Sequence, residues 1–326
     1  MTALRTALTA ALGIEHPVLL APMGSVAGGR LAAAVSDAGG LGLVGVGYAE
    51  HSAVAREFDR AGGSPVGCGF ITWVLDRRPT LLDLVLDRRP VAVMLSFGDP
   101  SPHIPRIHAA GVPVLCQVSS ARDAAGALDV GADVVVAQGG EGGGHGTRER
   151  STMTLVPEVC DMVERRGLVT PVVAAGGIAD GRGVAAALVL GAAGVLVGTR
   201  FWASAEALVS PASHERAAAA SGDDTIATTV YDRVRGITWP PGYTSRVLRS
   251  PFVADWAGRE DELGQELHRL APAYHRAVRD DDVDVAQIVA GEAVGLVARA
   301  EPAGKVLEGL VSGAVAALRD TGGVLD

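Results

Sequence analysis

The sequence predicts a (β/α)8 TIM barrel with a small helical cap domain inserted after the eighth strand. Between residue 16 and about residue 200, short apolar runs alternate with Ala-rich helical patterns, and Gly or Pro marks the junctions. Most runs are continuously apolar, as expected of parallel strands that are covered on both faces. Eight strands with intervening helices match the barrel, which commonly uses about 250 residues. The candidate strands are residues 18–21, 41–46, 66–70, 91–95, 112–117, 134–137, 172–175 and 195–197.

An internal repeat supports the strand count. The Pro-Val-Leu run at 113–115 and the following Gly-Ala turn and strand recur roughly 60 residues later, starting at 171–173. An open, doubly wound sheet is the alternative architecture. It would bind its ligand where the strand order reverses, rather than on a closed ring of strand ends.

After residue 222 the composition changes to Pro, Gly and charged residues, and six of the thirteen aromatic side chains lie there. We therefore expect the barrel in residues 1–222 and 283–326, and a helical cap in residues 223–282 that covers the strand ends and lines a pocket. Each aromatic residue could also simply hold the small module together. The aromatic residues concerned are Tyr231, Trp239, Tyr243, Phe252, Trp256 and Tyr274.

Composition and charge exclude several classes of protein. The formal net charge of -9 argues against a general nucleic-acid binder. Three widely spaced cysteines form neither a zinc motif nor a disulfide framework, which fits a reducing cytoplasm. The longest uncharged stretch, residues 183–199, is too short to span a membrane. Leu4, Leu8 and Leu12 recur every four residues, which favours an amphipathic helix over a signal peptide at the start of the chain.

Two glycine-containing loops follow the seventh and eighth predicted strands. Gly176 and Gly177 join a strand to the next helix, and Gly198 and Thr199 repeat the arrangement one strand later. Paired glycines let backbone N–H groups approach a phosphate, and barrels commonly bind phosphate at these two loops. Each loop alone could be only a tight turn, but together they predict a phosphate-binding site.

A third loop, residues 138–147, contains six glycines and His145. Glycine loses more conformational freedom on ordering than any other residue, so we expect this loop to approach a ligand closely. An imidazole that titrates near neutral pH can move a proton at a substrate carbon, although His145 could instead cap backbone groups. His103 and His108 lack convergent ligands, and the acidic run at 279–284 lacks the Gly and Glu of an EF-hand. We predict no metal site.

Four motifs stand together at the predicted strand ends. They are Ala21-Pro22-Met23-Gly24 and the segments 139–146, 175–180 and 198–201. With segments 229–232, 246–250 and 291–296, they resemble the FMN-dependent nitronate monooxygenases, formerly called 2-nitropropane dioxygenases. The resemblance covers nearly the whole chain. The same superfamily contains flavin-dependent enoyl-acyl-carrier-protein reductases and NAD(P)H:quinone reductases.

The resemblance implies FMN as cofactor and a role for each motif residue. The loops after strands seven and eight would hold the phosphate, and the segment after strand one would line the isoalloxazine ring. Two glutamines would approach the flavin from the ends of strands five and six. The family's active-site histidine falls on His145. The implied cofactor-binding residues are Gly176, Gly177, Gly198 and Thr199 for the phosphate, Pro22, Met23 and Gly24 for the ring, and Gln117, Gln138, Gly69 and Gly143 around them.

The chain departs from the family pattern at three positions. Gly69 stands where the family commonly has Asn, Gly142 where it has Ala, and Ser250 where Asn is frequent. We expect the first two changes to enlarge or loosen the site.

The resemblance implies oxidation of alkyl nitronates, or of nitroalkanes first deprotonated by His145, with oxygen as electron acceptor and with a carbonyl compound and nitrite as products. An NAD(P)H-dependent reductase acting on an enoyl thioester or a quinone is the alternative, and a flavin-binding protein without activity is a third interpretation. The partners are a small-molecule substrate and oxygen, with neither nucleic acid nor membrane. A homodimer is a candidate assembly.

Overall fold

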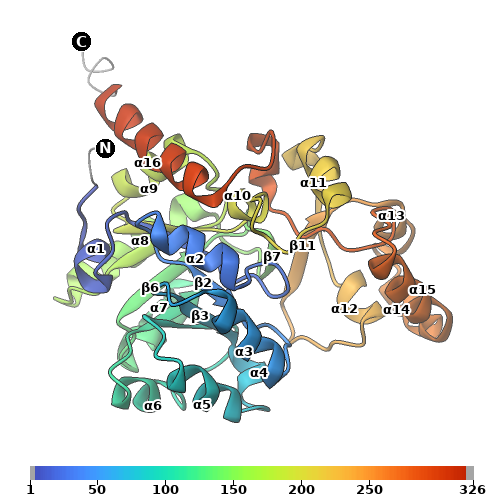
Figure 1. Ribbon diagram of the computed structural model, residues 1–326, viewed down its shortest axis with the longest axis horizontal. Coiled ribbons are helices and arrows are strands. Elements are labelled where there is room, and N and C mark those ends of the chain that lie inside the picture. Colours follow the sequence, from blue (N-terminus) through green and yellow to red (C-terminus); the bar gives the residue numbers. More distant parts are fainter. Residues whose placement is uncertain (1–3, 321–326) are drawn as a thin grey trace.

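The barrel is a ring of eight parallel strands in a computed structural model that describes residues 4–320 (Figure 1). The strand order is β1-β9-β8-β6-β5-β4-β3-β2. The ring closes because Leu41, just before β2, bridges Leu19 in β1, and the Leu20 N–H donates to the Leu41 carbonyl at 2.9 Å. The predicted (β/α)8 barrel is confirmed, and the open sheet is wrong. The strands are β1 (Val18–Leu20), β2 (Leu43–Gly45), β3 (Gly67–Ile71), β4 (Val93–Ser96), β5 (Val114–Val118), β6 (Val134–Gln138), β8 (Val172–Ala175) and β9 (Gly194–Val197).

Helices cover the outside of the ring. The helix that packs beside α9 comes from the end of the chain, since α16 contacts both α9 and α2. Small residues permit this approach: a Cβ added at Gly181 in α9 would lie 2.2 Å from the Gly313 backbone in α16. The outer helices are α2 (Gly29–Asp37), α3 (His51–Arg60), α4 (Thr72–Leu75), α5 (Thr80–Asp87), α6 (Ile104–Ala109), α7 (Ala121–Asp129), α8 (Thr152–Arg165), α9 (Gly181–Val189), α10 (Thr199–Trp202) and α16 (Ala303–Asp320).

Two apolar layers form because successive residues of a strand point to opposite faces. Val18 and Leu20 face the outer helices, whereas Leu19 faces the barrel interior. Helix α1 (Ala7–Leu12) closes the interior at the amino-terminal ends of the strands, remote from α13–α15 (Figure 1). The predicted amphipathic helix is confirmed for Leu8 and Leu12, whereas Leu4 precedes it. The interior cluster contains Leu8, Leu12, Leu19, Leu41, Leu43, Met94, Leu115, Val134, Val136, Val173 and Leu196.

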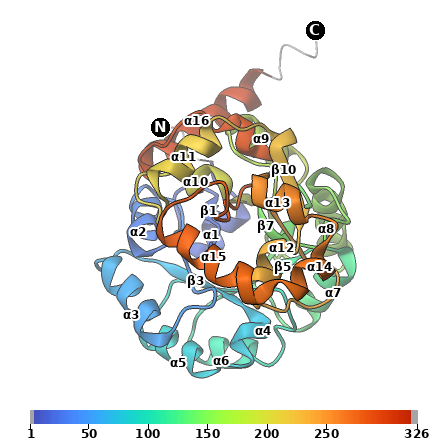
Figure 2. The ribbon, with the colours of Figure 1, turned by 90° about the vertical axis from the view of Figure 1, so that its right-hand side faces the viewer.

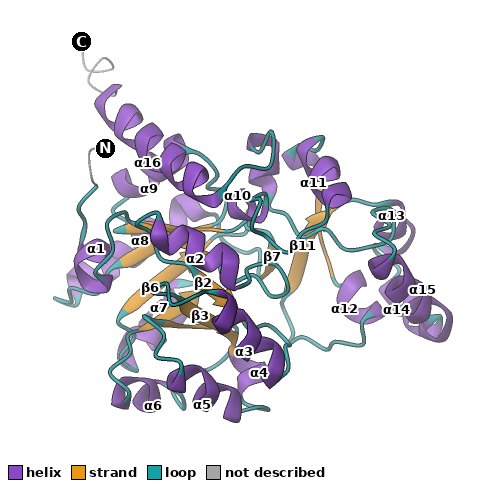
Figure 3. Ribbon diagram, in the orientation of Figure 1, coloured by secondary structure: helices purple, strands orange, loops and turns teal. Residues whose placement is uncertain are grey.

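A second unit stands over the carboxyl ends of the barrel strands. Its short antiparallel sheet has the order β10-β11-β7, and β7 belongs to the glycine-rich loop of the barrel. Figure 3 shows β7 and β11 between the barrel and helices α12–α15. The prediction of a purely helical cap is therefore wrong, whereas the boundaries of the cap stay a prediction. The elements are β7 (Gly144–Gly146), β10 (Thr225–Thr228), β11 (Thr244–Leu248), α11 (Pro211–Ala218), α12 (Val230–Val234), α13 (Pro251–Trp256), α14 (Glu260–Gln265), α15 (Leu267–Arg279) and the 3-10 turns Gly222–Asp224 and Glu292–Leu296.

The aromatic residues of this unit divide into two groups. Tyr231, Phe252 and Tyr274 pack against one another, with ring centroids 5.7 to 6.5 Å apart, and hold the module together. Trp239 and Tyr243 instead contact Phe97, which follows β4 of the barrel. Figure 2 shows α15 crossing over the mouth of the ring.

The helices of residues 4–320 include none that is long and apolar enough to cross a membrane.

Replacing Leu8 by Ala should lower the free energy of unfolding by about 2–5 kcal/mol, because it leaves a cavity while keeping a good helix former. Leu8 is fully buried in the interior cluster, whereas Val189 in α9 is 73% exposed. Val189→Ala is therefore the matched control, with an expected change below about 0.5 kcal/mol. Urea denaturation followed by circular dichroism measures both, and equal effects would contradict the role assigned to α1.

Candidate functional site

One cavity of about 620 Å³ opens at the carboxyl ends of the barrel strands, between the barrel and the cap. Such strand ends carry the functional groups of TIM barrels. Every residue that the sequence singled out for the site lines this cavity, although the cavity alone does not assign a role to any of them. They are Pro22, Met23, Gly24, Gly69, Gln117, Gln138, Gly143, His145, Gly176, Gly177, Gly198 and Thr199.

Four backbone N–H groups form one end of the cavity. Gly176 and Gly177 adopt the left-handed conformation, with φ of 99° and 73°, which favours glycine. Within residues 4–320, the N–H groups of these two residues and of Gly198 and Thr199 donate to no other group. The Thr199 hydroxyl accepts from the Gly291 N–H at 2.9 Å. Unsatisfied donors at the ends of β8 and β9 suit a phosphate.

The cavity wall formed by the segment after β1 packs closely against the backbone of the neighbouring strands. A Cβ added at Gly69 would lie 2.3 Å from Cγ of Pro22, so the Pro22 ring occupies the space that an Asn side chain would need. The expectation that Gly69 enlarges the site is therefore wrong. At Gly142, an added Cβ would approach no atom closer than 3.4 Å, so an Ala there would fit. Ser250 does not line the cavity, and its hydroxyl lies 3.1 Å from that of Tyr231 inside the cap.

Gln117 and Gln138, which both line the cavity, differ in their hydrogen bonds. Gln138 donates from Nε2 to the His145 carbonyl at 3.0 Å and so helps to hold the glycine-rich loop. Nε2 of Gln117 is buried and has no hydrogen-bond partner among the described residues. Buried donors without partners are rare in proteins and are unfavourable unless a ligand satisfies them. A flavin ring, with several acceptor atoms, fits the Gln117 amide.

Arg148 holds the glycine-rich loop in place, and no sequence pattern indicated this role. Its guanidinium donates to the carbonyls of Gly140 at 3.0 Å and Gly142 at 2.6 Å, and also to those of Gly144 and Thr244. Burial lowers the pKa of Arg148 to about 10, and the charge of Arg246 acts in the same direction. The group therefore remains cationic at neutral pH.

His145 projects from β7 and contacts a buried carboxylate of the cap. Its Nε2 lies 2.9 and 3.1 Å from the two oxygens of Asp232, whose side chain is only 4% exposed. Trp239 stacks on the imidazole, with centroids 3.6 Å apart and planes at 11°. Because Nε2–H donates to the carboxylate, Nδ1 is the nitrogen that can accept a proton.

Phe97 adds a strained aromatic wall beside this pair. It has a φ of 65°, which is unusual for a bulky residue, and its ring centroid lies 5.1 Å from that of Trp239. Neither Phe97 nor Asp232 was predicted from the sequence as a site residue, although Asp232 ends one of the segments that carry the family resemblance.

No group of three or more His, Cys, Asp or Glu side chains with metal-binding geometry occurs in the part of the chain that the structure describes.

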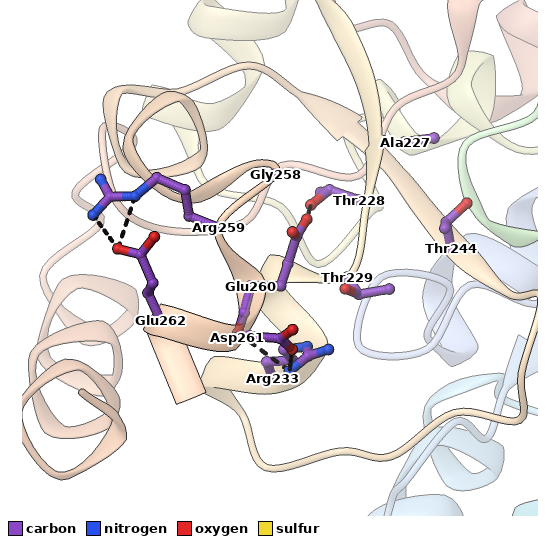
Figure 4. Close-up of a pocket in the computed structure, with 10 residues that line it drawn as sticks. All are labelled: Ala227, Thr228, Thr229, Arg233, Thr244, Gly258, Arg259, Glu260, Asp261 and Glu262. Carbon is purple, nitrogen blue, oxygen red and sulfur yellow. Dashed lines mark hydrogen bonds and ion pairs between the residues drawn. The ribbon is translucent and has the colours of Figure 1, made fainter. Parts of the chain in front are cut away.

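A second cavity, of about 530 Å³, lies on the cap and contains none of the predicted site residues (Figure 4). Its charged side chains satisfy one another: Arg233 pairs with Asp261 at 3.1 Å, and Arg259 pairs with Glu262 at 2.5 Å. Glu260 accepts from the Thr228 hydroxyl at 3.5 Å. Both arginines of this cavity are therefore engaged in ion pairs.

Comparison with known proteins identifies the family. A family model described as nitronate monooxygenase matches residues 5–62 and 73–313. The chain belongs to the nitronate monooxygenase family. It is accordingly a flavin-dependent oxidoreductase.

Three similar proteins span most of the chain. Nitronate monooxygenase npaC of Metarhizium robertsii is 37% identical over 325 residues, covering 89% of this chain and 88% of its own. The structure of FabK from Thermotoga maritima has a TM-score of 0.85 at 33% identity and covers 98% of this chain and 99% of its own. Nitroalkane oxidase from Streptomyces ansochromogenes has a TM-score of 0.80 at 27% identity, covering 97% and 99%.

Gly69→Ala should weaken flavin binding and lower the free energy of unfolding by about 1–3 kcal/mol, because the new methyl group collides with Pro22. Gly126 in α7 has no atom within 4 Å of an added Cβ and is the matched control. Gly126→Ala should instead stabilise the fold by roughly 0.5–1 kcal/mol. Thermal unfolding and the flavin content of the purified variants test both expectations, and a normal flavin content in Gly69→Ala would contradict the contact with Pro22.

Proposed function

We propose that the protein binds FMN and oxidises alkyl nitronates and nitroalkanes with oxygen, releasing a carbonyl compound and nitrite. The observation that carries this proposal is the His145–Asp232 pair, which faces the same cavity as the free N–H groups of the β8 and β9 loops. A histidine supported by a carboxylate is a suitable base for a carbon acid. Membership of the nitronate monooxygenase family supports the same reaction.

FMN fits the polar groups that the cavity leaves unsatisfied. Gly176, Gly177, Gly198 and Thr199 would hold its phosphate, Pro22, Met23 and Gly24 would line the ring, and Gln117 would donate to a ring acceptor. Gly69, Gly143 and Gln138 would complete the wall. When bound, the flavin supplies the redox chemistry by accepting electrons from the substrate.

His145 would remove the proton from the carbon next to a neutral nitro group. Asp232 keeps Nε2 protonated and Nδ1 free, and its charge stabilises the imidazolium that forms. Trp239 fixes the plane of the ring by stacking on it. The cap side chains that line the cavity would orient the substrate carbon, which lowers the barrier further.

FMN should bind the apoprotein at least about tenfold more tightly than riboflavin, because only FMN carries the phosphate that four backbone N–H groups would hold. Quenching of flavin fluorescence during titration measures both affinities. Mass spectrometry of the flavin released from the purified protein identifies the natural cofactor. Equal affinities for FMN and riboflavin would contradict the phosphate site.

His145→Asn should spare nitronate turnover while lowering nitroalkane turnover by roughly 10²-fold or more, because a nitronate needs no deprotonation. Asp232→Asn should move the same ratio in the same direction, since it acts through His145. Nitrite release from ethylnitronate and from nitroethane gives the two rates. Equal loss on both substrates would refute the role of His145 as base.

An NAD(P)H-dependent reductase acting on an enoyl thioester or a quinone is the second candidate, and the close structural similarity to FabK favours it. Anaerobic consumption of NADH or NADPH with such acceptors distinguishes it from nitronate oxidation.

A homodimer and a cytoplasmic location also remain predictions. The three cysteines are free, with Cys68 and Cys116 buried, which is compatible with a reducing compartment.

A further inference from the structure

Helix α12 directs two charged residues toward the cavity. Asp232 contacts His145, and Arg235, at the carboxyl end of the helix, lines the cavity. The Arg235 guanidinium lies 5.5 Å from the centre of the Tyr48 ring. Tyr48 also lines the cavity, so the two side chains share one part of its wall.

Arg235 forms no ion pair within residues 4–320. Among residues 4–320, no carboxylate lies within ion-pair distance of its guanidinium, and its one hydrogen bond is a long contact of 3.4 Å to Oε1 of Gln287. The nearby carboxylate of Asp232 is already bound to His145 at 2.9 and 3.1 Å. Arg235 is also the only Lys or Arg that lines the cavity in the described part of the chain. A partly buried cation without a counter-charge is a suitable site for an anion.

Two neutral donors lie beside this cation. The Tyr48 hydroxyl and Nε1 of Trp239 are buried. Among the described residues neither makes a hydrogen bond of full geometry, but the Trp239 indole lies close enough to the phenol to lower its pKa. Burial raises the pKa of Tyr48 to about 12, and the charge of Asp232 acts in the same direction, whereas the charge of Arg235 and the contact with Trp239 oppose it. The phenol therefore keeps its proton at neutral pH. Trp239 is the ring that stacks on His145. Donors and base therefore border the same space.

We infer that Arg235 and the Tyr48 hydroxyl, which the Trp239 indole adjoins, form an anion-binding subsite that holds the two oxygens of a nitronate. A nitronate is planar and shares its negative charge between two oxygens, as a carboxylate does, and a guanidinium binds such a pair with two parallel hydrogen bonds. A neutral nitroalkane offers the same shape without the charge. The subsite thus selects nitronate anions at the binding step. This inference rests on the proposed function and narrows its substrate class to anions.

Arg235→Met tests the inference against a matched variant, Arg233→Met. Arg233 lies on the same helix but pairs with Asp261 at 3.1 Å outside the catalytic cavity, so both variants remove one positive charge from α12. The KM for ethylnitronate should rise roughly tenfold or more in Arg235→Met, because a hydrogen bond to a charged group is lost, and should stay unchanged in Arg233→Met. The KM for nitroethane should change much less in either variant.

Binding of propionate and propionamide provides a readout without turnover. Propionate has the shape and charge of ethylnitronate, and propionamide has the shape alone. Calorimetry should show propionate binding to the wild-type holoenzyme, binding at least about tenfold weaker in Arg235→Met, and partial recovery in Arg235→Lys, which keeps the charge but not the fork. Propionamide affinity should not follow this series.

The outcomes separate this inference from the proposed function. Absence of nitronate oxidation by the wild-type protein would overturn the proposed function, whereas the propionate series would still support the anion subsite. Loss of flavin from Arg235→Met and Arg235→Lys would overturn the inference, because Arg235 would then hold the cofactor. An unchanged affinity for propionate in folded, flavin-loaded Arg235→Met would also overturn it.

Discussion

The pairing of β7 with β11 positions every group that we assign to proton transfer. β7 belongs to a barrel loop, while β11 belongs to the cap, so their hydrogen bonds join the two units beside the cavity. His145 stands opposite Ser245 in this ladder and thereby reaches Asp232 on α12. Six glycines could not hold such a register alone. Arg148 supplies the missing constraint, since its buried guanidinium binds carbonyls from both strands.

Close backbone contacts explain why a barrel with few aromatic residues is rich in glycine. Gly69 lets the Pro22 ring lie against β3, and Gly45 leaves no room for a Cβ, which would lie 2.3 Å from the Met23 carbonyl oxygen. The cavity wall after β1 is therefore supported by backbone atoms rather than by side chains. A flat ligand then meets N–H groups and a proline ring, whose positions do not depend on rotamers. This arrangement preorganises the cavity before a ligand binds.

Local patterns predicted the barrel because each buried strand is a continuous apolar run, and all eight predicted strands are present. The same logic located the cavity residues, since functional groups of a barrel follow its strands. Asp232 could not be paired with His145 in this way, because 87 residues separate them and only the antiparallel pairing of β7 and β11 brings them together. The strands of the cap were missed for the same reason: β10 and β11 are short and half-polar, and a partner from the barrel completes their sheet.

The division of chemistry between barrel and cap has a consequence for specificity. The barrel presents neutral donors from β5, β8 and β9, which suit a cofactor phosphate and ring. The cap supplies Asp232, which contacts His145, and Arg235, which lines the cavity. Changes on α12 can therefore alter which substrate anion is held without disturbing the groups that face the cofactor. Since FabK and nitroalkane oxidase share this architecture over nearly their whole length, substrate differences on such a scaffold are expected to arise from the cap-facing side chains rather than from the fold. On the roles that we propose, the Asp232 and Arg235 positions, one helical turn apart, would set this preference in this chain.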